Sequence, residues 1–415
     1  MSTSKHLLDC DPEIAACIQR EASRQQQTLT LIAAETVTST AVQEALRAPL
    51  SEISIDDSCS LPHERHSGSP IGGAEELAAS RAKVLFGAEH VNVCPHSGAL
   101  ANMAVYLSAL KLGDTILGPD LAHGGHTSAG HASNYSSQLF TAIHYGVRAD
   151  TERIDLDQVE DLARQHRPKL IVVGGTAFPR HLDFKAFHEI ASRVGAYLSA
   201  DITHVAGLLI AGLHPTPIGL ADFVTTSTSH TLRGPRGGIV IAPRQRAGAV
   251  DRAVMPGVQS SALANAIAAK AVAFLEVSSP GWRIYQQRAI NNAAVLAQGL
   301  VRRGYRLVTG GSDTHLLLLD LTTQNLTGKD AQEALEQAGI VVNKNPIPFD
   351  RRGLLSTSGI RLGTLTLTAR GMREAEMEHI ADLIHRVLTS PRSAHHFRRV
   401  RSEVGELCDR FRIPD

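Results

Sequence analysis

Short apolar, β-rich runs alternate with segments of helical periodicity along most of the chain. Apolar residues recur at helical spacing over residues 75–86, 98–113, 156–166 and 184–195. Between these segments lie the β-rich runs 91–95, 115–119, 169–175, 196–202, 223–229 and 238–243. Strands that alternate with helices predict an α/β fold with a mainly parallel sheet and helices on both faces. In such sheets, ligands bind at the carboxyl ends of the strands.

The pattern changes toward both ends of the chain. Residues 11–27 are polar with helical spacing, and a long helical stretch over about residues 262–304 precedes a second group of strands. These strands are expected at 306–310, 315–321, 340–345 and 359–364, before a helix from Gly371 and a charged terminal helix. We therefore predict an N-terminal arm (1–30), a large α/β domain with the ligand site (31–280) and a smaller α+β C-terminal domain (281–415). Segment 51–73 is polar and loop-like.

Composition excludes several classes of partner. The 415 residues are 43% hydrophobic and 20% charged, with a formal net charge of zero, which favours neither nucleic acid nor a membrane surface. Apolar runs fall far short of the ~20 residues of a membrane span, and the N-terminus lacks a signal-peptide core. The five cysteines are scattered without a C-x-x-C pair. We expect a reduced, cytoplasmic protein.

Eight motifs are spread over most of the chain. They are LIAAETVTS (31–39), PHSGALAN (95–102), LGPDLAHGGH (117–126), SADITHVAGL (199–208), TLRGPRGG (231–238), NLTGKD (325–330), VVNKN (341–345) and TSGIRLGT (357–364). Together they resemble serine hydroxymethyltransferase, in the same order and at similar spacing, from about residue 10 to the C-terminus. The resemblance implies the fold type I (aspartate-aminotransferase-like) architecture and a homodimer with shared active sites. That family moves a hydroxymethyl group between serine and glycine with pyridoxal phosphate and tetrahydrofolate.

One half of the family's pyridoxal phosphate pocket is present. Asp201 matches the aspartate that pairs with the pyridine nitrogen, and a carboxylate there makes the ring an electron sink. His126 matches the histidine that stacks on the ring, and His204 matches another pocket histidine. Thr176 stands where the family has a small hydroxyl residue. Arg361 matches the arginine that grips the amino-acid carboxylate, a task suited to its bidentate fork.

The other half of that pocket departs from the family. His230 stands where the family has the lysine that binds the cofactor as a Schiff base, and an imidazole cannot form that bond because it lacks a primary amine. The further departures are Ser229 for a histidine, Ala34 and Ala99 for serines, and Ser260 and Ser261 for the paired glycines of a phosphate loop. Together these departures argue against covalently held pyridoxal phosphate.

The sequence leaves several roles open. His230 could be a general acid or base, or a substitution tolerated in a site that has lost its chemistry. A metal site of His230 with His126 and His204 is an alternative without a metalloenzyme spacing. Asp201 could orient one of the histidines, face a heterocycle or be a relic. Arg361 could instead form a structural ion pair.

The family's folate-binding residues are better retained in this sequence than its pyridoxal phosphate residues. Leu121, Gly124 and Gly125 match the loop that lines the pterin, and Asn345 matches the residue that hydrogen-bonds the pterin ring. We therefore expect a tetrahydrofolate derivative as the one-carbon donor.

Segment 51–73 is the gap in the resemblance. The family has an aromatic- and glycine-rich loop there, with a glutamate that assists folate chemistry, and those aromatics are absent here. Asp57, or its neighbour Asp56, falls near the place of the glutamate. Either could act as a carboxylate acid or base, and either could equally be a turn or cap aspartate.

The leading hypothesis is an enzyme of this fold that works without pyridoxal phosphate. It would pass a formyl, formimidoyl or similar unit from the folate to an amine or amino acid, and specialised (natural-product) metabolism is the setting that would tolerate such divergence. Such a transfer requires proximity, a base and an acid, and no electron sink. A hydroxymethyltransferase or aldolase with non-covalent pyridoxal phosphate, and a non-catalytic folate-binding homologue, are the alternatives. The groups for these roles are His230, His126 or His204, and Asp56 or Asp57, with Arg361 for a carboxylate.

Overall fold

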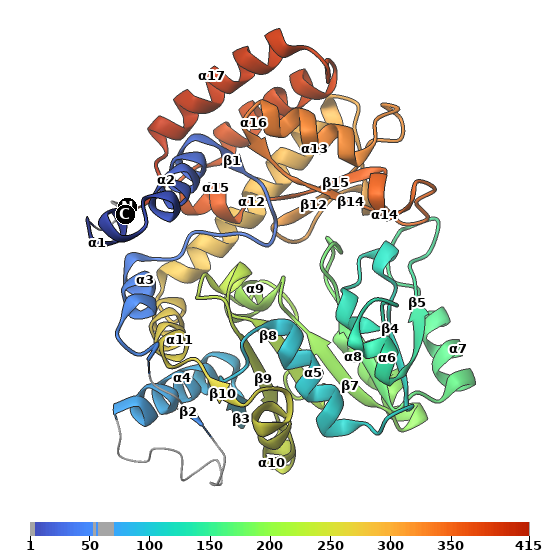
Figure 1. The fold of residues 1–415 in the computed structure, drawn as a ribbon. Helices are drawn as coiled ribbons and strands as arrows, with labels where there is room; N and C mark the ends of the chain where they lie inside the picture. Colours follow the sequence, from blue (N-terminus) through green and yellow to red (C-terminus); the bar gives the residue numbers. More distant parts are fainter. Residues whose placement is uncertain (1–4, 53–54, 57–69, 415) are drawn as a thin grey trace. The chain divides into compact units, whose positions relative to one another are not determined.

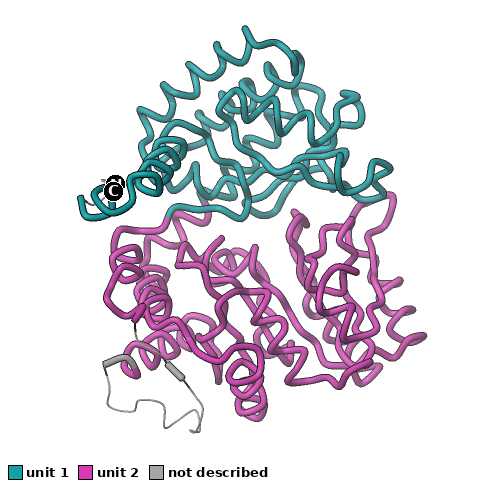
Figure 2. The backbone as a smooth tube through the Cα atoms, viewed as in Figure 1, with its two compact units in different colours: residues 1–37, 288–415 teal, residues 38–287 magenta. Residues whose placement is uncertain are grey.

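The computed structural model describes residues 5–52, 55–56 and 70–414. The chain divides into two compact units, which are shown in separate colours in Figure 2. Unit 1 consists of residues 1–37 with 288–415, and unit 2 consists of residues 38–287. This division differs from the predicted one. Residues 1–37 belong with the C-terminal part, and the second boundary falls inside the helix α12 (Gly281–Arg302).

Unit 2 is built on a mainly parallel sheet (Figure 1). Within the described residues the sheet has seven strands, and of these only β9 runs in the direction opposite to the other six. The predicted α/β class with a mainly parallel sheet is therefore confirmed. In spatial order the strands are β3 (His90–Asn92), β9 (Gly238–Ala242), β8 (Phe223–Ser227), β7 (Tyr197–Asp201), β6 (Leu170–Gly174), β4 (Thr115–Pro119) and β5 (Thr141–Tyr145).

Helices pack along this sheet because each has one apolar face. In α8, for example, Phe184, Phe187 and Ile190 are buried on one side, the Asp183 side chain caps the first turn, and Gly195 ends the helix in a left-handed conformation. Helix α5 packs on β7, β8 and β9, α8 on β6 and β7, and α7 on β4 and β5. The helices of unit 2 are α3 (Thr40–Arg47), α4 (Pro70–Phe86), α5 (Gly98–Ala109), α6 (Tyr135–Leu139), α7 (Leu156–His166), α8 (Phe184–Val194), α9 (Ala206–Ile210), α10 (Ala247–Arg252) and α11 (Ala264–Val277).

Unit 1 contains an antiparallel sheet covered by helices. Among the described residues its strand order is β11 (Arg306–Leu307), β12 (Leu316–Asp320), β15 (Gly359–Gly363) and β14 (Asn343–Asn345). The short strand β1 (Leu29–Thr30) pairs in parallel with β13 (Ile340–Val341). Leu29 and Leu31 lie in the same buried core as Leu296 and Leu319, so the N-terminal segment is part of this unit. The helices are α1 (Lys5–Cys10), α2 (Pro12–Gln27), α13 (Gly328–Gln337), α14 (Gly353–Ser356), α15 (Leu365–Ala369), α16 (Glu374–Leu388) and α17 (Ala394–Arg410).

The guanidinium of Arg370 ties the N-terminal segment to the C-terminal helix. Arg370 is only 5% exposed and hydrogen-bonds carbonyl oxygens at the ends of both α2 and α17. The last carbonyls of a helix have no partner within it and carry the negative end of its dipole, so a cation satisfies both ends at once. The acceptors are the carbonyl oxygens of Gln25, Gln26, Thr28, Cys408 and Phe411.

Two other predicted segments differ in detail from the structure. The helical stretch expected over 262–304 is two helices, α11 and α12, and the break falls where Ser278 caps α11 before Pro280. In segment 51–73, the backbone of β2 (Ile55–Asp56) pairs antiparallel with β10 (Ser261–Ala262), and α4 begins at Pro70. No helix among the described residues has the length and apolar character needed to cross a membrane.

Candidate active site

A cavity of about 170 Å³ lies in unit 2 where β4, β6, β7 and β8 end. This is the carboxyl edge of the parallel strands, as the sequence predicted. Its volume is close to the ~150 Å³ of a protein cavity known to hold one benzene ring, so a single aromatic ring fits. Five of its lining residues, His126, Thr176, Asp201, His204 and His230, were candidates from the sequence. The other polar lining side chains are Ser97, Asn102, Ser128, Thr203, Ser227 and Arg236.

Asp201 is held at the end of β7 by hydrogen bonds to both carboxylate oxygens. Oδ2 accepts from the Asn102 amide at 2.8 Å, and Oδ1 accepts from the Thr203 backbone N–H at 3.0 Å. The same Asn102 nitrogen donates to Ser128 Oγ at 2.9 Å. A carboxylate held by such donors keeps a fixed direction in the cavity.

His126 is oriented by the same network. Its Nδ1 accepts the Ser128 backbone N–H at 3.2 Å and lies 2.7 Å from Ser128 Oγ. Because a backbone N–H can only donate, Nδ1 carries the lone pair, and in the neutral ring Nε2 carries the proton. The ring therefore presents a donor at Nε2.

His230 and His204 form a second pair of rings at the cavity. His230 begins a 3-10 turn, His230–Leu232, directly after β8, and His204 lies just past the end of β7. The two rings meet edge to face with centroids 5.0 Å apart. His230 has φ +54°, in the left-handed region that a non-glycine residue rarely adopts. Strain of this kind persists only where the surrounding structure holds it, and it concentrates at functional sites.

Burial and the negative charge of Asp201 raise the pKa of two neighbouring tyrosines, the half-buried Tyr135 and the buried Tyr106. Burial raises the pKa of Tyr135, and the negative charge of Asp201 raises it further. Burial likewise raises the pKa of Tyr106 well above its ordinary value, and its hydroxyl donates to the Ser128 carbonyl at 2.9 Å. Both phenols therefore stay neutral and support the site as fixed donors.

The loop expected to line a pterin is fastened to the cavity wall. Leu121 begins a 3-10 turn that ends at Gly124, which has φ +93°. Thr176 donates from its backbone N–H to the Gly124 carbonyl at 2.8 Å, and from its hydroxyl to the Gly125 carbonyl at 2.9 Å. A Cβ at Gly125 would lie 2.5 Å from the carbonyl oxygen of Pro119, so only glycine allows this turn.

Asn345 and Arg361 lie in unit 1, on the paired strands β14 and β15. Arg361 Nη2 donates to Asn343 Oδ1 at 3.1 Å, and burial lowers the pKa of Arg361 to about 10. The Asn345 amide donates to the Pro346 carbonyl at 2.7 Å. Asp57 lies outside the described residues, and of Asp56 only the backbone, in β2, is described.

The arrangement of His126, His204 and His230 bears on the metal alternative. Within the described parts of the chain, no group of His, Cys, Asp and Glu side chains is arranged to hold a metal ion. His126, His204 and His230 are all described, so the metal alternative has no support in their arrangement.

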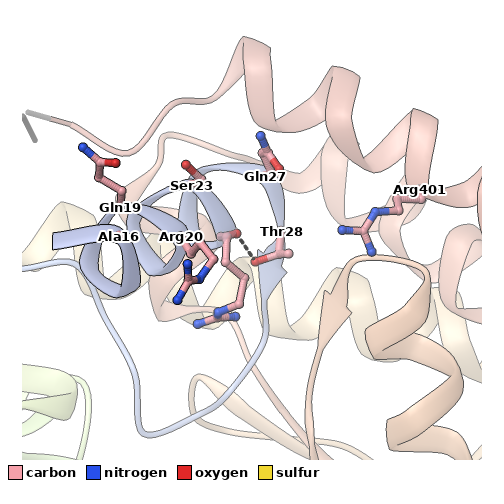
Figure 3. A pocket seen from close by; sticks show the side chains of 8 residues that line it. Ala16, Gln19, Arg20, Ser23, Gln27, Thr28 and Arg401 are labelled. Carbon is pink, nitrogen blue, oxygen red and sulfur yellow. Dashed lines mark hydrogen bonds between the residues drawn. The ribbon is translucent and has the colours of Figure 1, made fainter. Parts of the chain in front are cut away.

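A second depression, of about 450 Å³, lies in unit 1 beside α2 (Figure 3). Three of its eight lining residues are arginines, of which Arg24 pairs with Glu21 and Arg401 donates to the Gln337 carbonyl. None of the lining residues is a histidine, aspartate or glutamate. The lining residues are Ala16, Gln19, Arg20, Ser23, Arg24, Gln27, Thr28 and Arg401.

Sequence reasoning missed several residues of the cavity. Asn102 lies inside the PHSGALAN motif, and Ser227 lies inside the Ser/Thr run that ends β8, so both segments had been singled out. The run of hydroxyl residues at a strand end was a usable signal, because ligands bind there. The pairing of Asn102 with Ser128 and Asp201 had no signal in sequence spacing.

A mainly parallel sheet with helices along it and a cavity at its carboxyl edge defines an α/β fold with a ligand site in the usual place. Residues 7–384 match the family model for serine hydroxymethyltransferase, and the chain belongs to that family. The family has fold type I, as expected from the sequence. Its members transfer one-carbon units between small molecules, and they use tetrahydrofolate and pyridoxal phosphate.

The residues at the cavity do not fit covalently held pyridoxal phosphate. The described lining of the cavity includes no lysine, and Ala99 offers no hydroxyl to a phosphate. Lys270 lies nearby on α11, but it is 1% exposed and its ammonium donates to the carbonyls of Val93, Pro95 and Gly238 at 2.6, 3.0 and 3.0 Å. Burial lowers the pKa of Lys270 to about 8. The Lys270 nitrogen is nevertheless occupied by hydrogen bonds to these three backbone carbonyls.

Proposed function

We propose that this protein transfers a one-carbon unit from a tetrahydrofolate derivative to an amine or amino acid without pyridoxal phosphate. The observation that carries the proposal is the cavity itself. His126, His204, His230 and Asp201 gather at one edge of the sheet, and the described lining has no primary amine. Such a set of side chains supports proton transfer rather than Schiff-base chemistry.

The reaction proceeds by addition and elimination at a carbon of the formyl or formimidoyl level. The acceptor nitrogen forms a bond to that carbon and gives up a proton to a base. The bond from the carbon to the folate nitrogen then breaks, and that nitrogen takes a proton from an acid. The products are the N-substituted acceptor and tetrahydrofolate, and no carbanion forms.

The proposed roles follow from the hydrogen bonds. His230 is the base, and as the imidazolium it then returns the proton to the leaving folate nitrogen. His126, whose Nε2 carries the proton in the neutral ring, donates a hydrogen bond to the reacting group. Asp201 stabilises positive charge that develops in the cavity. Leu121, Gly124 and Gly125 of unit 2 bind the pterin. For Asn345 and Arg361 of unit 1, the family resemblance implies contacts to a pterin ring and to a carboxylate.

Calorimetric titration tests the proposal most directly. Formylated and formimidoylated tetrahydrofolates and pyridoxal phosphate are titrated separately and in competition, with and without glycine. We expect the reduced folates to bind and pyridoxal phosphate not to bind. Product formation is then followed by mass spectrometry with glycine and other small amines as acceptors.

A second candidate is a hydroxymethyltransferase or aldolase that holds pyridoxal phosphate non-covalently. The fixed carboxylate of Asp201 and the one-ring volume of the cavity favour it. An absorbance band that appears on adding pyridoxal phosphate with glycine would support this candidate and overturn the first. Binding of folates with no turnover for any acceptor would instead indicate a folate-binding homologue.

A further inference from the structure

A line of hydrogen bonds connects His230 to the backbone carbonyl of Gly237, the residue before β9. His230 Nδ1 lies 2.9 Å from Ser229 Oγ, which lies 2.9 Å from Ser227 Oγ. The Ser227 hydroxyl lies 3.2 Å from the Gly237 carbonyl oxygen and donates to it. The family resemblance assigns no role to either serine.

The Gly237 carbonyl at the end of this line determines which atom donates in each hydrogen bond. A carbonyl oxygen can only accept, and a hydroxyl has one proton to donate. When Ser227 gives its proton to Gly237, it must accept from Ser229. Ser229 has then used its own proton, so it must accept from His230. The donor is the Nδ1–H of the imidazole, and the lone pair of the neutral ring is on Nε2.

The Ser227 end of the line is held by further hydrogen bonds. The Ser227 N–H donates to Thr203 Oγ1 at 3.1 Å, and the Thr228 N–H donates to the Gly237 carbonyl at 3.0 Å. The Thr228 hydroxyl donates to the Pro235 carbonyl at 2.7 Å. The Gly237 carbonyl, which is the acceptor at the end of the line, is therefore held beside Ser227.

We propose that Ser229 and Ser227 are positioning residues that hold His230 as its Nδ1–H tautomer, so that Nε2 is the basic nitrogen. The proposal rests on the proposed function, in which His230 is the base for the acceptor amine. The serines do not touch the reacting atoms. They act through His230, as a hydrogen-bond partner on one ring nitrogen selects the tautomer of the other.

Other charged groups at the cavity act on His230 through space rather than through this line. Asp201 and His204 come from β7 and the loop after it, His126 from the loop after β4, and Arg236 from the loop before β9. Beyond the turn, Arg233 lies over the ring of Tyr285 at 4.9 Å. Substitution of Ser229 leaves these groups in place, so its effect reports on the hydrogen-bond line.

The tautomer can be measured without any substrate. Protein labelled with ¹⁵N in its histidine rings is studied by long-range ¹H–¹⁵N NMR at mildly alkaline pH, and the His230→Asn variant assigns the signal. We expect Nδ1 to carry the proton in the native protein and in Ser229→Thr, which keeps the hydroxyl. Ser229→Ala and Ser227→Ala should shift the ring toward the Nε2–H form. A native His230 with its proton on Nε2 overturns the proposal, whether or not turnover is found.

Kinetics with the folate donor then separate positioning from folding. Ser229→Ala should lower kcat about tenfold, the loss expected for one neutral hydrogen bond, with KM little changed. Ser229→Thr should restore the rate, and Ser279→Ala, an exposed serine, should have no effect. A native rate in Ser229→Ala overturns the role of the line. Absence of turnover in the native protein would instead refute the proposed function and leave the NMR result to decide the tautomer.

Discussion

The rings of His204 and His230 meet edge to face, with centroids 5.0 Å apart and planes at 83°. Each ring is part of the packing surface of the other, so a substitution that removes a ring also disturbs its neighbour. A variant that keeps the ring and removes its nitrogens can therefore separate chemistry from packing. Phenylalanine is that variant, because an aromatic edge can still meet the imidazole face.

We predict that His230→Phe lowers kcat for one-carbon transfer by about 10²- to 10⁴-fold, the usual contribution of a general base. Folate affinity, measured by calorimetry, should change less than about threefold, because the pterin loop is held by Thr176 rather than by His230. His396→Gln, an exposed histidine on α17, is the control. A rate in His230→Phe within tenfold of the native rate would contradict the assigned role.

We predict that substitution of Arg370 lowers the free energy of unfolding, although Arg370 does not line the candidate active site. Arg370→Met removes the donors of carbonyl oxygens at the ends of α2 and α17. Buried polar groups that lose their partners are costly, so we expect the free energy of unfolding to fall by about 3 to 5 kcal/mol in urea titrations.

Arg370→Lys separates charge from geometry. An ammonium keeps the positive charge but has fewer donors than a guanidinium and lacks its planar fork, so we expect only partial recovery. The exposed Arg398 on α17 supplies the matched control, Arg398→Met. Equal unfolding midpoints for Arg370→Met and Arg398→Met would show that the carbonyls find other partners.

Lys270 is predicted to be structural rather than catalytic. Lys270→Met removes the bonds to the carbonyls of Val93, Pro95 and Gly238 and should destabilise the protein by about 2 to 4 kcal/mol. Borohydride treatment with pyridoxal phosphate should leave Lys270 unmodified in the native protein, because its amine is buried and committed to the backbone. Peptide mass mapping checks this, with the exposed Lys111 as the reference. Selective labelling of Lys270 would refute the assignment.

Asp350 should make the loop beside Asn345 sensitive to acid. Burial alone would raise the pKa of the Asp350 carboxyl, but hydrogen bonds from the Ser358 hydroxyl and from the backbone N–H groups of Arg352, Ser358 and Ile347 outweigh it and lower the pKa. A carboxyl with a lowered folded pKa stabilises the folded state above its unfolded value of about 4. That stabilisation is lost as the pH falls through the folded value.

Hydrogen exchange of the Arg352 and Ser358 amides measures this loss. Protection should be constant from neutral pH to about pH 5 and fall below about pH 4, after correction for intrinsic exchange. Asp350→Asn should show lower protection at neutral pH and no further loss in acid. Asp161→Asn, at an exposed position on α7, should behave like the native protein. Acid-independent protection in the native protein would contradict the prediction.

The apolar runs predicted the central strands well because those strands are buried on both faces. In β6, β8 and β9 every residue is buried, so the sequence itself is a continuous apolar or small-residue run. The edge strand β5 was not predicted, because its residues are largely half-exposed and its sequence TAIHY has no such run. The division into units was also not readable, since the β1–β13 pairing joins Leu29 to Ile340 across most of the chain.

The site contains residues that the sequence motifs identified and residues whose roles only their hydrogen bonds reveal. His126, Thr176, Asp201, His204 and His230 could be named from the sequence, and the structure brings them to one cavity. Roles for Asn102 and Ser128 could not be named, because they depend on contacts between distant segments. Roles for Ser227 and Ser229 could not be named, because they depend on side-chain positions and hydrogen-bond directions that the local sequence does not give.

The sequence by itself determined the alternation of strands and helices, the serine hydroxymethyltransferase family and the presence of a histidine at position 230. Those properties follow from local periodicity and from residue identity. Only the tertiary structure decided which groups donate hydrogen bonds to Asp201 and which nitrogen of His126 accepts a hydrogen bond. The reason is physical, because a hydrogen bond requires a donor and an acceptor about 3 Å apart, and folding alone brings them to that distance.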